Sequence, residues 1–270
     1  MVVRDDLLRL TTVHAGLDTL LVLLLLFHFP SRPAAPPSRS AAAPRFHFLA
    51  GFRVLAGSKD CWLVLAVYAF PQCLVQLWQS MMVVSLTGPK LGFGEGWVET
   101  LGLSLSLVSG ALFTLHTDSI TTDCSAVLGS ILLASLLSRF RRRLKLCILL
   151  LLAGASVLYS VLTAVLEGGL PHSPAMLYLL LLPATTLALA SSPLAFELAV
   201  ETCYPVNEGV IGGWLTGWFN LLGAIFFLVF LVPGVGTRWL NYVLPASVLI
   251  PFPAICLAKE LYTRDKIDRE

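Results

Sequence analysis

The sequence predicts an all-α protein that crosses a membrane several times, a polytopic transmembrane helical bundle. Hydrophobic residues make up 57% of its 270 residues, and only 13% are charged. Soluble domains carry about a quarter charged residues, so this chain has too few to cover a water-facing surface. The mean hydropathy of +0.83 points the same way. Helices pair their own backbone groups and therefore suit a lipid environment.

Several apolar runs are long enough to cross a bilayer, which requires about 20 such residues in a helix. They cover roughly residues 10–29, 61–86, 146–166, 175–196, 210–232 and 239–257. The stretch 98–138 is ambiguous, because His116, Asp118 and Asp123 divide it into two shorter runs. The charged residues on either side of this stretch indicate how many times it crosses the membrane.

Lysine and arginine cluster in three segments, at 30–59, 139–145 and 259–270. The positive-inside rule places all three on the cytoplasmic side, so an even number of crossings must separate each pair. The stretch 98–138 should therefore cross once. We favour 121–138 as that crossing, with 98–116 as an extra segment on the far side, and the reverse assignment remains open.

This count divides the chain into four parts. A transmembrane helix at 1–29 precedes a cytoplasmic Pro/Ser/Arg-rich loop at 30–59. A transmembrane part of six helices at 60–258 follows, and a cytoplasmic tail at 259–270 ends the chain. The expected partner is the lipid bilayer, and no basic patch with interleaved aromatic residues predicts binding to nucleic acid.

The run 61–86 carries hydrogen-bonding side chains that share one helix face, because their spacings are four, four and three residues. They are Tyr68, Gln72, Gln76 and Gln79, with Pro71 and Trp78 among them. Such groups are costly in lipid unless they face a cavity or another helix. The stripe therefore indicates a ligand-facing surface, where Trp78 would hold a cation or stack on a flat ring. Hydrogen bonding between helices is the alternative, and both interpretations stay open.

The run 210–232 begins with two overlapping GxxxG units, formed by Gly209, Gly213 and Gly217. Small residues let helices approach closely, so we predict helix packing at Gly213 and Gly217. Asn220 is an amide among apolar neighbours and is the better candidate for ligand binding. It also fits a role in joining two helices by a hydrogen bond.

Residues 196–209 read FELAVETCYPVNEG and form an acidic motif at the end of a predicted helix. Glu197 and Glu201 lie one turn apart on one face, and Pro205 should end the helix near Tyr204. We predict a gating or structural role, including pairing with the basic cluster at 139–145. The residues assigned to this motif are Glu197, Glu201, Tyr204, Pro205, Glu208 and Gly209.

No nucleophile and no metal-binding set accompanies these carboxylates. The sequence therefore predicts no enzyme, no cofactor and no metal site. The six cysteines include no CxxC pair, and most lie in apolar runs. We interpret them as small buried hydrophobic side chains rather than a disulfide framework.

The acidic motif resembles the FEL-x-VE-x-x-YP-x-x-EG signature of the transporters related to the feline leukaemia virus subgroup C receptor. The Pro-rich stretch 29–38 and the segment WLNYVLP at 239–245 are also similar to parts of this solute carrier family. The resemblance implies a major facilitator fold. This chain would supply its C-terminal half plus one preceding helix, with residues 1–29 resembling helix six.

The resemblance further implies transport of a small organic solute, vitamin-like or choline-like, by alternating access with proton coupling. It implies a multi-pass protein of the lysosomal membrane, with the plasma membrane as the alternative. In choline-handling relatives the eleventh helix supplies a substrate-contacting Gln, and Asn220 occupies the matching position. The candidate substrate-binding set is Tyr68, Gln72, Gln76, Trp78 and Asn220.

Helices one to five of the family fold have no counterpart in this chain, so we expect an incomplete transporter. The alternative is a non-transporting membrane protein that associates with a full-length partner or with a second copy of itself. A membrane-embedded enzyme is the third option, and it lacks a catalytic constellation.

The charge pattern generates a test of the membrane topology. In a cysteine-free background, Arg45→Cys, Arg142→Cys and Asp268→Cys should each react with a membrane-impermeant maleimide from the cytoplasmic side alone, because the basic segments share that side. Labelling of any one of the three positions from the opposite side contradicts the predicted orientation.

Overall fold

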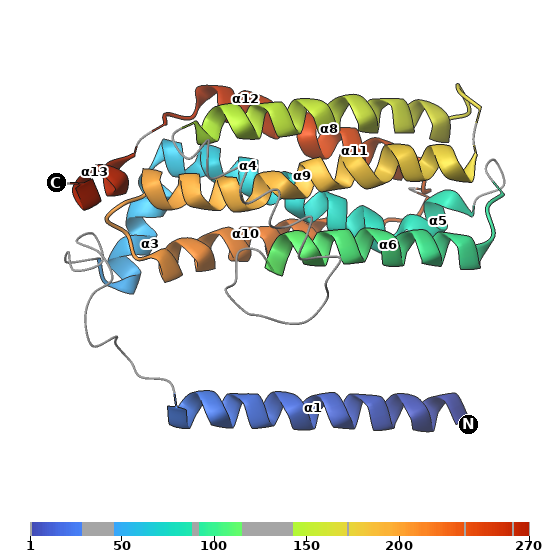
Figure 1. The fold of residues 1–270 in the computed structure, drawn as a ribbon, viewed down its shortest axis with the longest axis horizontal. Coiled ribbons are helices and arrows are strands. Elements are labelled where there is room, and N and C mark those ends of the chain that lie inside the picture. The colour runs from blue at the N-terminus through green and yellow to red at the C-terminus, as the bar shows by residue number, and fades with distance from the viewer. Residues whose placement is uncertain are drawn as a thin grey trace. The chain divides into compact units, whose positions relative to one another are not determined.

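The computed structural model describes residues 2–28, 46–87, 92–114, 143–171, 173–234, 236–260 and 262–269. The chain forms two compact units, Met1–Ala43 and Pro44–Glu270. The first unit contains α1 (Val2–His28), which confirms a helix in the first apolar run. The second unit contains the helical bundle (Figure 1).

The bundle consists of long helices that lie side by side (Figure 1). They are α4 (Lys59–Ser80), α6 (Glu95–Thr114), α8 (Leu144–Leu166), α9 (Pro174–Thr202), α10 (Glu208–Val229), and α11 (Leu240–Leu249) followed by α12 (Pro251–Leu257). Among the described residues, α4, α8, α9, α10 and the α11–α12 pair are long and apolar enough to cross a membrane. All described elements are helical, and this confirms the predicted polytopic bundle.

Two helices of the bundle are interrupted where the predicted runs are continuous. The run 61–86 ends as a long helix at Ser80, and α5 (Met82–Leu86) follows after Met81. The last run divides at Ile250, because Pro251 supplies no backbone donor to the preceding turn. Pro71, by contrast, lies inside α4.

The centre of the core is formed by α4, α8 and α9. Helix α8 packs along α9, and α4 contacts α9, α10, α11 and α12. Tyr159 of α8 is fully buried, and its hydroxyl donates to Thr185 Oγ1 of α9 at 3.3 Å. This bond satisfies a polar group that the apolar core would otherwise penalise.

Helix α6 forms the first part of the ambiguous stretch. It spans Glu95–Thr114 and packs against α9, so residues 98–114 belong to the bundle rather than to an extra segment outside it. In Figure 1, α6 lies alongside α9 and extends from the end of the bundle near α5 toward its middle. Helix α6 is not among the described helices that are long and apolar enough to cross a membrane, and 121–138 lies outside the described residues. Which of the two runs crosses therefore stays a prediction.

A short helix corrects the predicted loop at 30–59. Helix α3 (Phe48–Gly57) lies within that segment and packs against α10. At Gly51, α3 lies close to Val206 and Val210, since a Cβ at this position would lie 3.1 Å from Val206 Cγ1 and 3.4 Å from Val210 Cγ1. The apolar residues at 48–55 thus form a helix with a buried side, a signal that the Pro/Ser/Ala-rich composition of the neighbouring residues obscures.

Polar contacts fasten the bundle at the end where α8 stops. Glu167 follows α8 and accepts hydrogen bonds from the Arg238 guanidinium, with Nη2 at 2.7 Å. Its other oxygen accepts from Asn241 Nδ2 at 2.9 Å, and Thr163 Oγ1 donates to the Asn241 carbonyl oxygen at 2.9 Å. These contacts join α8 to the start of α11.

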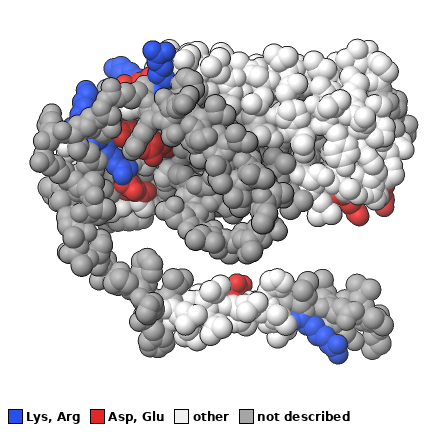
Figure 2. All heavy atoms as spheres, in the orientation of Figure 1, with Lys and Arg blue, Asp and Glu red and all other residues white. Residues whose placement is uncertain are grey.

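Basic side chains gather at the opposite end, where α4 and α8 begin and where α13 (Thr263–Arg269) lies (Figure 2). The described residues there include Arg53, Lys59, Arg143, Lys145, Lys259, Arg264 and Lys266. The bundle therefore brings three basic segments that are distant in sequence to one end, which supports the predicted orientation.

The packing of α3 can be tested with a matched pair of glycine variants. Gly51→Val should lower the apparent melting temperature in detergent, because its side chain would displace α3 from α10 at a cost of about 1–3 kcal/mol. Gly57→Val is the control, since a Cβ at Gly57 would meet nothing within 4 Å. Equal melting temperatures of the two variants would contradict this packing.

Candidate functional site

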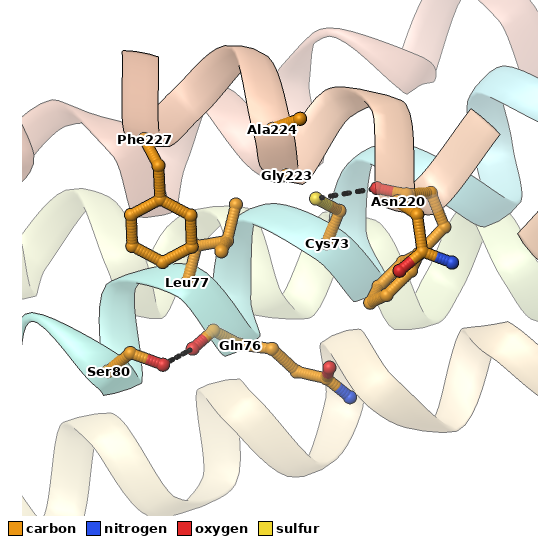
Figure 3. Close-up of a pocket in the computed structure, with 9 residues that line it drawn as sticks. Cys73, Gln76, Leu77, Ser80, Asn220, Gly223, Ala224 and Phe227 are labelled. Atoms are coloured by element: carbon orange, nitrogen blue, oxygen red, sulfur yellow. Dashed lines mark hydrogen bonds between the residues drawn. The ribbon is translucent and has the colours of Figure 1, made fainter. Parts of the chain in front are cut away.

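A pocket that contains sequence-predicted residues lies between α4 and α10 (Figure 3). Its volume is about 360 Å³. The lining residues are Cys73, Gln76, Leu77 and Ser80 of α4 with Phe219, Asn220, Gly223, Ala224 and Phe227 of α10. The pocket therefore combines an apolar wall with two amide side chains.

Helix α4 presents this wall because residues three, four and seven positions apart share a helix face. Cys73 Sγ donates to the Phe219 carbonyl oxygen of α10 at 3.4 Å. Ser80 Oγ donates to the Gln76 carbonyl oxygen at 3.1 Å, within its own helix. Both bonds involve backbone oxygens, so the Gln76 amide is not engaged in them (Figure 3).

Helix α10 supplies the second amide and the space beside it. Asn220 is exposed, and its Nδ2 donates to the Thr216 carbonyl oxygen one turn earlier at 2.8 Å. This bond orients the side chain and leaves its carbonyl oxygen as an acceptor for a ligand. Gly223 and Ala224 carry little side-chain volume, which leaves room in front of Leu77 (Figure 3).

The polar stripe of α4 is divided between the pocket and the bundle interior. Gln76 lines the pocket, whereas Gln72 is buried and its Oε1 has no partner among the described residues. Gln79 Nε2 is likewise buried and unpaired there. Tyr68 lies beside Phe196 of α9, with ring centroids 6.5 Å apart.

Trp78 does not lie in this pocket, which corrects the expectation that it shares a cavity with Gln76 and Asn220. Its side chain is fully buried in the core, and Nε1 has no partner among the described residues. The reason is helical geometry, since residues two positions apart point to nearly opposite faces. Trp78 is therefore close to the polar stripe of α4 in sequence, but it points away from the pocket that Gln76 lines.

A second pocket of about 220 Å³ lies beside α3 and α10. Its lining residues are Phe52, Gly213, Trp214, Gly217, Trp218 and Leu221. Trp62 of α4 packs edge-on against Trp214 and Trp218, with centroid distances of 5.1 and 4.9 Å. Sequence reasoning missed this aromatic cluster, although Trp214 and Trp218 are one turn apart.

Gly213 and Gly217 line this second pocket instead of holding two helices together. A Cβ at either position would meet nothing within 4 Å. The predicted close packing is therefore not provided by any helix of the described residues. Both glycines lie exposed on α10, as does Asn220 further along it.

The acidic motif lies where α9 ends and α10 begins. As Pro205 predicts, α9 ends at Thr202, close to Tyr204. Asn207 caps α10 by accepting from the Gly209 N–H at 2.9 Å. Glu208 in the first turn suits the positive end of the helix dipole. The motif thus forms a short, capped corner between two long helices.

The acidic motif contacts the C-terminal segment. Glu201 is buried, and its Oε2 accepts from the Arg264 backbone N–H at 3.0 Å. The Arg264 guanidinium lies 3.3 Å from Glu208 Oε1. Pairing with 139–145 was one of the predicted roles, and residues 139–142 lie outside the described part. Glu197 is partly buried on α9.

The same C-terminal segment is fastened to the start of α8. Lys145 Nζ donates to the carbonyl oxygens of Cys256 and Ala258 at 2.8 and 2.9 Å. The Tyr262 hydroxyl donates to the Glu260 carboxylate and accepts from the Leu144 N–H. Burial and this carboxylate raise the pKa of the Tyr262 phenol, so the hydroxyl keeps its proton at physiological pH.

Two cysteines correct the interpretation of all six as separate buried side chains. The structure joins Cys61, in the first turn of α4, to Cys203, the residue that follows α9, through their sulfur atoms. The other described cysteines, Cys73, Cys147 and Cys256, are free. A separation of 142 residues in sequence gives no local spacing signal for such a pair.

The bundle defines an integral, multi-pass membrane protein. No protein-family model matches the chain. The chain is 26% identical over 273 residues to the "Solute carrier family 49 member 4 homolog" of Xenopus tropicalis. It is 27% identical over 274 residues to the protein of the same name in Xenopus laevis. Each alignment covers 98% of this chain and 55% of the relative, so the chain spans about half the length of the curated relatives it matches.

The attachment of the C-terminal segment can be tested at Glu201. Glu201→Ala removes the acceptor of the Arg264 N–H, and a buried donor left unpaired costs about 1–3 kcal/mol. We expect several-fold faster trypsin cleavage after the exposed Lys259 in isolated membranes. Glu197→Ala is the matched control one turn earlier on α9. Equal cleavage rates in both variants would show that Glu201 does not hold the segment.

Proposed function

We propose that this chain is one half of a membrane transporter and that the pocket between α4 and α10 belongs to its solute path. The observation that carries the proposal is the convergence of the Gln76 and Asn220 amides on one pocket. Two hydrogen-bonding side chains from different helices thus line the same pocket.

The energetics of the bilayer support this proposal. An amide in a membrane-spanning segment is costly unless it meets a hydrogen-bonding partner or an aqueous cavity. The Asn220 amide satisfies only part of its hydrogen-bonding capacity within α10, through the bond from Nδ2 to the Thr216 carbonyl oxygen. A polar solute, or the water that precedes it, would satisfy the remainder.

The lining of the pocket indicates the class of solute. A volume of about 360 Å³ lies at the small end of ligand pockets. The described lining residues supply two amides, one hydroxyl, one thiol and apolar side chains, and none of these residues carries a carboxylate or a basic group. We therefore propose a small organic solute recognised by neutral hydrogen bonds, vitamin-like or choline-like, consistent with the resemblance to the receptor-related transporters.

The similarity to proteins named solute carriers supports the same proposal. Within the described residues the pocket has walls from α4 and α10 only. Alternating access needs a second half that rocks against the first, so we propose that another six-helix half supplies the facing wall. Proton coupling and placement in the lysosomal membrane, or alternatively the plasma membrane, complete the proposal by resemblance.

A second candidate function follows from the exposed side of α10. Gly213, Gly217 and Asn220 are open there, and lipid does not favour an exposed amide. A membrane partner with its own small-residue helix face would cover them. In this alternative the chain is a non-transporting protein that associates with a full-length transporter or with a second copy of itself.

The proposed solute path is tested by removing each amide at nearly constant volume. Asn220→Leu and Gln76→Leu should each lower uptake by roughly tenfold, the equivalent of about 1.4 kcal/mol for one lost hydrogen bond. The measurement is uptake of labelled choline and pyridoxine in cells expressing the chain together with a full-length relative that is inactive alone, normalised to surface or organelle abundance.

The matched control for these variants is Ser160→Leu. Ser160 is an exposed polar residue on α8, outside both pockets, and its hydroxyl donates to its own helix. Uptake should be unchanged by Ser160→Leu. If both amide variants also transport at the wild-type rate and abundance, Gln76 and Asn220 serve packing and the proposed path is wrong.

A further inference from the structure

The end of the bundle that carries the basic side chains also holds the Cys61–Cys203 pair. Cys61 lies in the first turn of α4, two residues after Lys59, and Cys203 follows the last residue of α9. Both cysteines are nearly fully buried, at 4% and 6% exposure. They are thus held against each other at a helix start and a helix end, rather than in the middle of the bundle.

The backbone positions suit a bond between these two side chains. Their Cα atoms are 6.3 Å apart, within the usual range of about 4.4–6.8 Å for disulfides. The bond would connect α4 directly to the corner between α9 and α10. No other pair among the described cysteines is joined, and Cys73, Cys147 and Cys256 remain free.

The charge pattern gives this pair a particular chemical setting. If the basic end faces the cytoplasm, as the positive-inside rule predicts, the pair faces a reducing compartment. Disulfides are uncommon there, and those that form are usually transient or redox-sensing. We propose that Cys61 and Cys203 form a reversible thiol–disulfide switch that ties α4 to the α9–α10 corner.

The switching step needs an oxidised partner, which we identify as a low-molecular-weight disulfide of the glutathione class. One cysteine thiolate attacks a sulfur of that disulfide, forming a mixed disulfide and releasing one thiol. The second cysteine thiolate then attacks the protein sulfur and releases the second thiol. The two protein thiols lose two electrons and two protons in total, and the small disulfide is reduced to two thiols.

The positions of the cysteines provide access for this exchange. Helix ends open locally more readily than helix centres, and both residues lie at ends. Reduction restores both thiols by the same exchange in reverse, with a thiol of the glutathione class as the reductant.

The bond would control a corner that also holds the C-terminal segment. Cys203 lies between Glu201 and Glu208, the two carboxylates that contact Arg264. In the oxidised state α4 fixes this corner and stabilises the attachment of the C-terminal segment. In the reduced state the corner is held by packing and hydrogen bonds alone, so the segment should detach more readily.

The switch is tested by counting reactive thiols in membranes that contain the full chain. After treatment with oxidised glutathione, the chain is denatured while free thiols are blocked, and it is then reduced. A polyethylene-glycol maleimide should report two newly released cysteines of the six in the chain. Mass spectrometry of the oxidised wild-type chain should show a linked peptide containing Cys61 and Cys203. Reduced glutathione should abolish both signals.

Cys61→Ser and Cys203→Ser should each remove the response, whereas Cys147→Ser should retain it. Trypsin cleavage after Lys259 should be slower in the oxidised wild type than in the reduced form, and equal in Cys203→Ser. The linked peptide needs no substitution, so it decides the matter even if a variant fails to fold. An unlinked wild-type chain after oxidation overturns the proposal, and so does a link that reduced glutathione does not break in the native membrane.

Discussion

Helix α4 sets the constraint on which the bundle depends, because it packs against α9, α10, α11 and α12 while carrying polar side chains into a setting without water. In lipid each of these groups must find a partner, a cavity or an enclosed position. The two sides of α4 meet this requirement in different ways. Gln72 is enclosed in the bundle, whereas Gln76 reaches a pocket. The orientation of α4 about its own axis therefore determines both which of its side chains pack in the core and which line the proposed site.

The pocket exists because α10 faces that side of α4 with small residues. Gly223 and Ala224 leave space opposite Leu77, and Asn220 places an amide at the margin of that space. Larger apolar residues at the small positions would close the gap and bury Gln76 without a partner. Helix α10 therefore provides both the space of the pocket and one of its two amide side chains. A helix that served packing alone would need neither feature.

The apolar runs are sufficient to predict the long helices, because lipid requires about 20 apolar residues in each crossing. They are insufficient for α6, where two short runs compete, and for α3, whose helix is hidden beside a Pro-rich stretch. The cost of polar side chains in lipid predicts that Gln76 and Asn220 face a cavity, and both line the pocket between α4 and α10. The same expectation fails for Trp78, because its angle around α4 points it into the core rather than toward the side that Gln76 occupies. The Cys61–Cys203 contact depends on tertiary structure, and no local pattern encodes it.

Several features that the pocket between α4 and α10 does not explain lie together at the basic end of the bundle. The α9–α10 corner there contacts the C-terminal segment through Glu201 and Glu208, and α4 through Cys203. Helix α3 packs on α10 at the same end, with Gly51 against Val206 and Val210. Motion between the ends of α4 and α10 would change the shape of the pocket, since these two helices form its walls. Contacts that fix the corner therefore bear on the pocket through rigid helices, and a role in gating stays a prediction for the acidic motif.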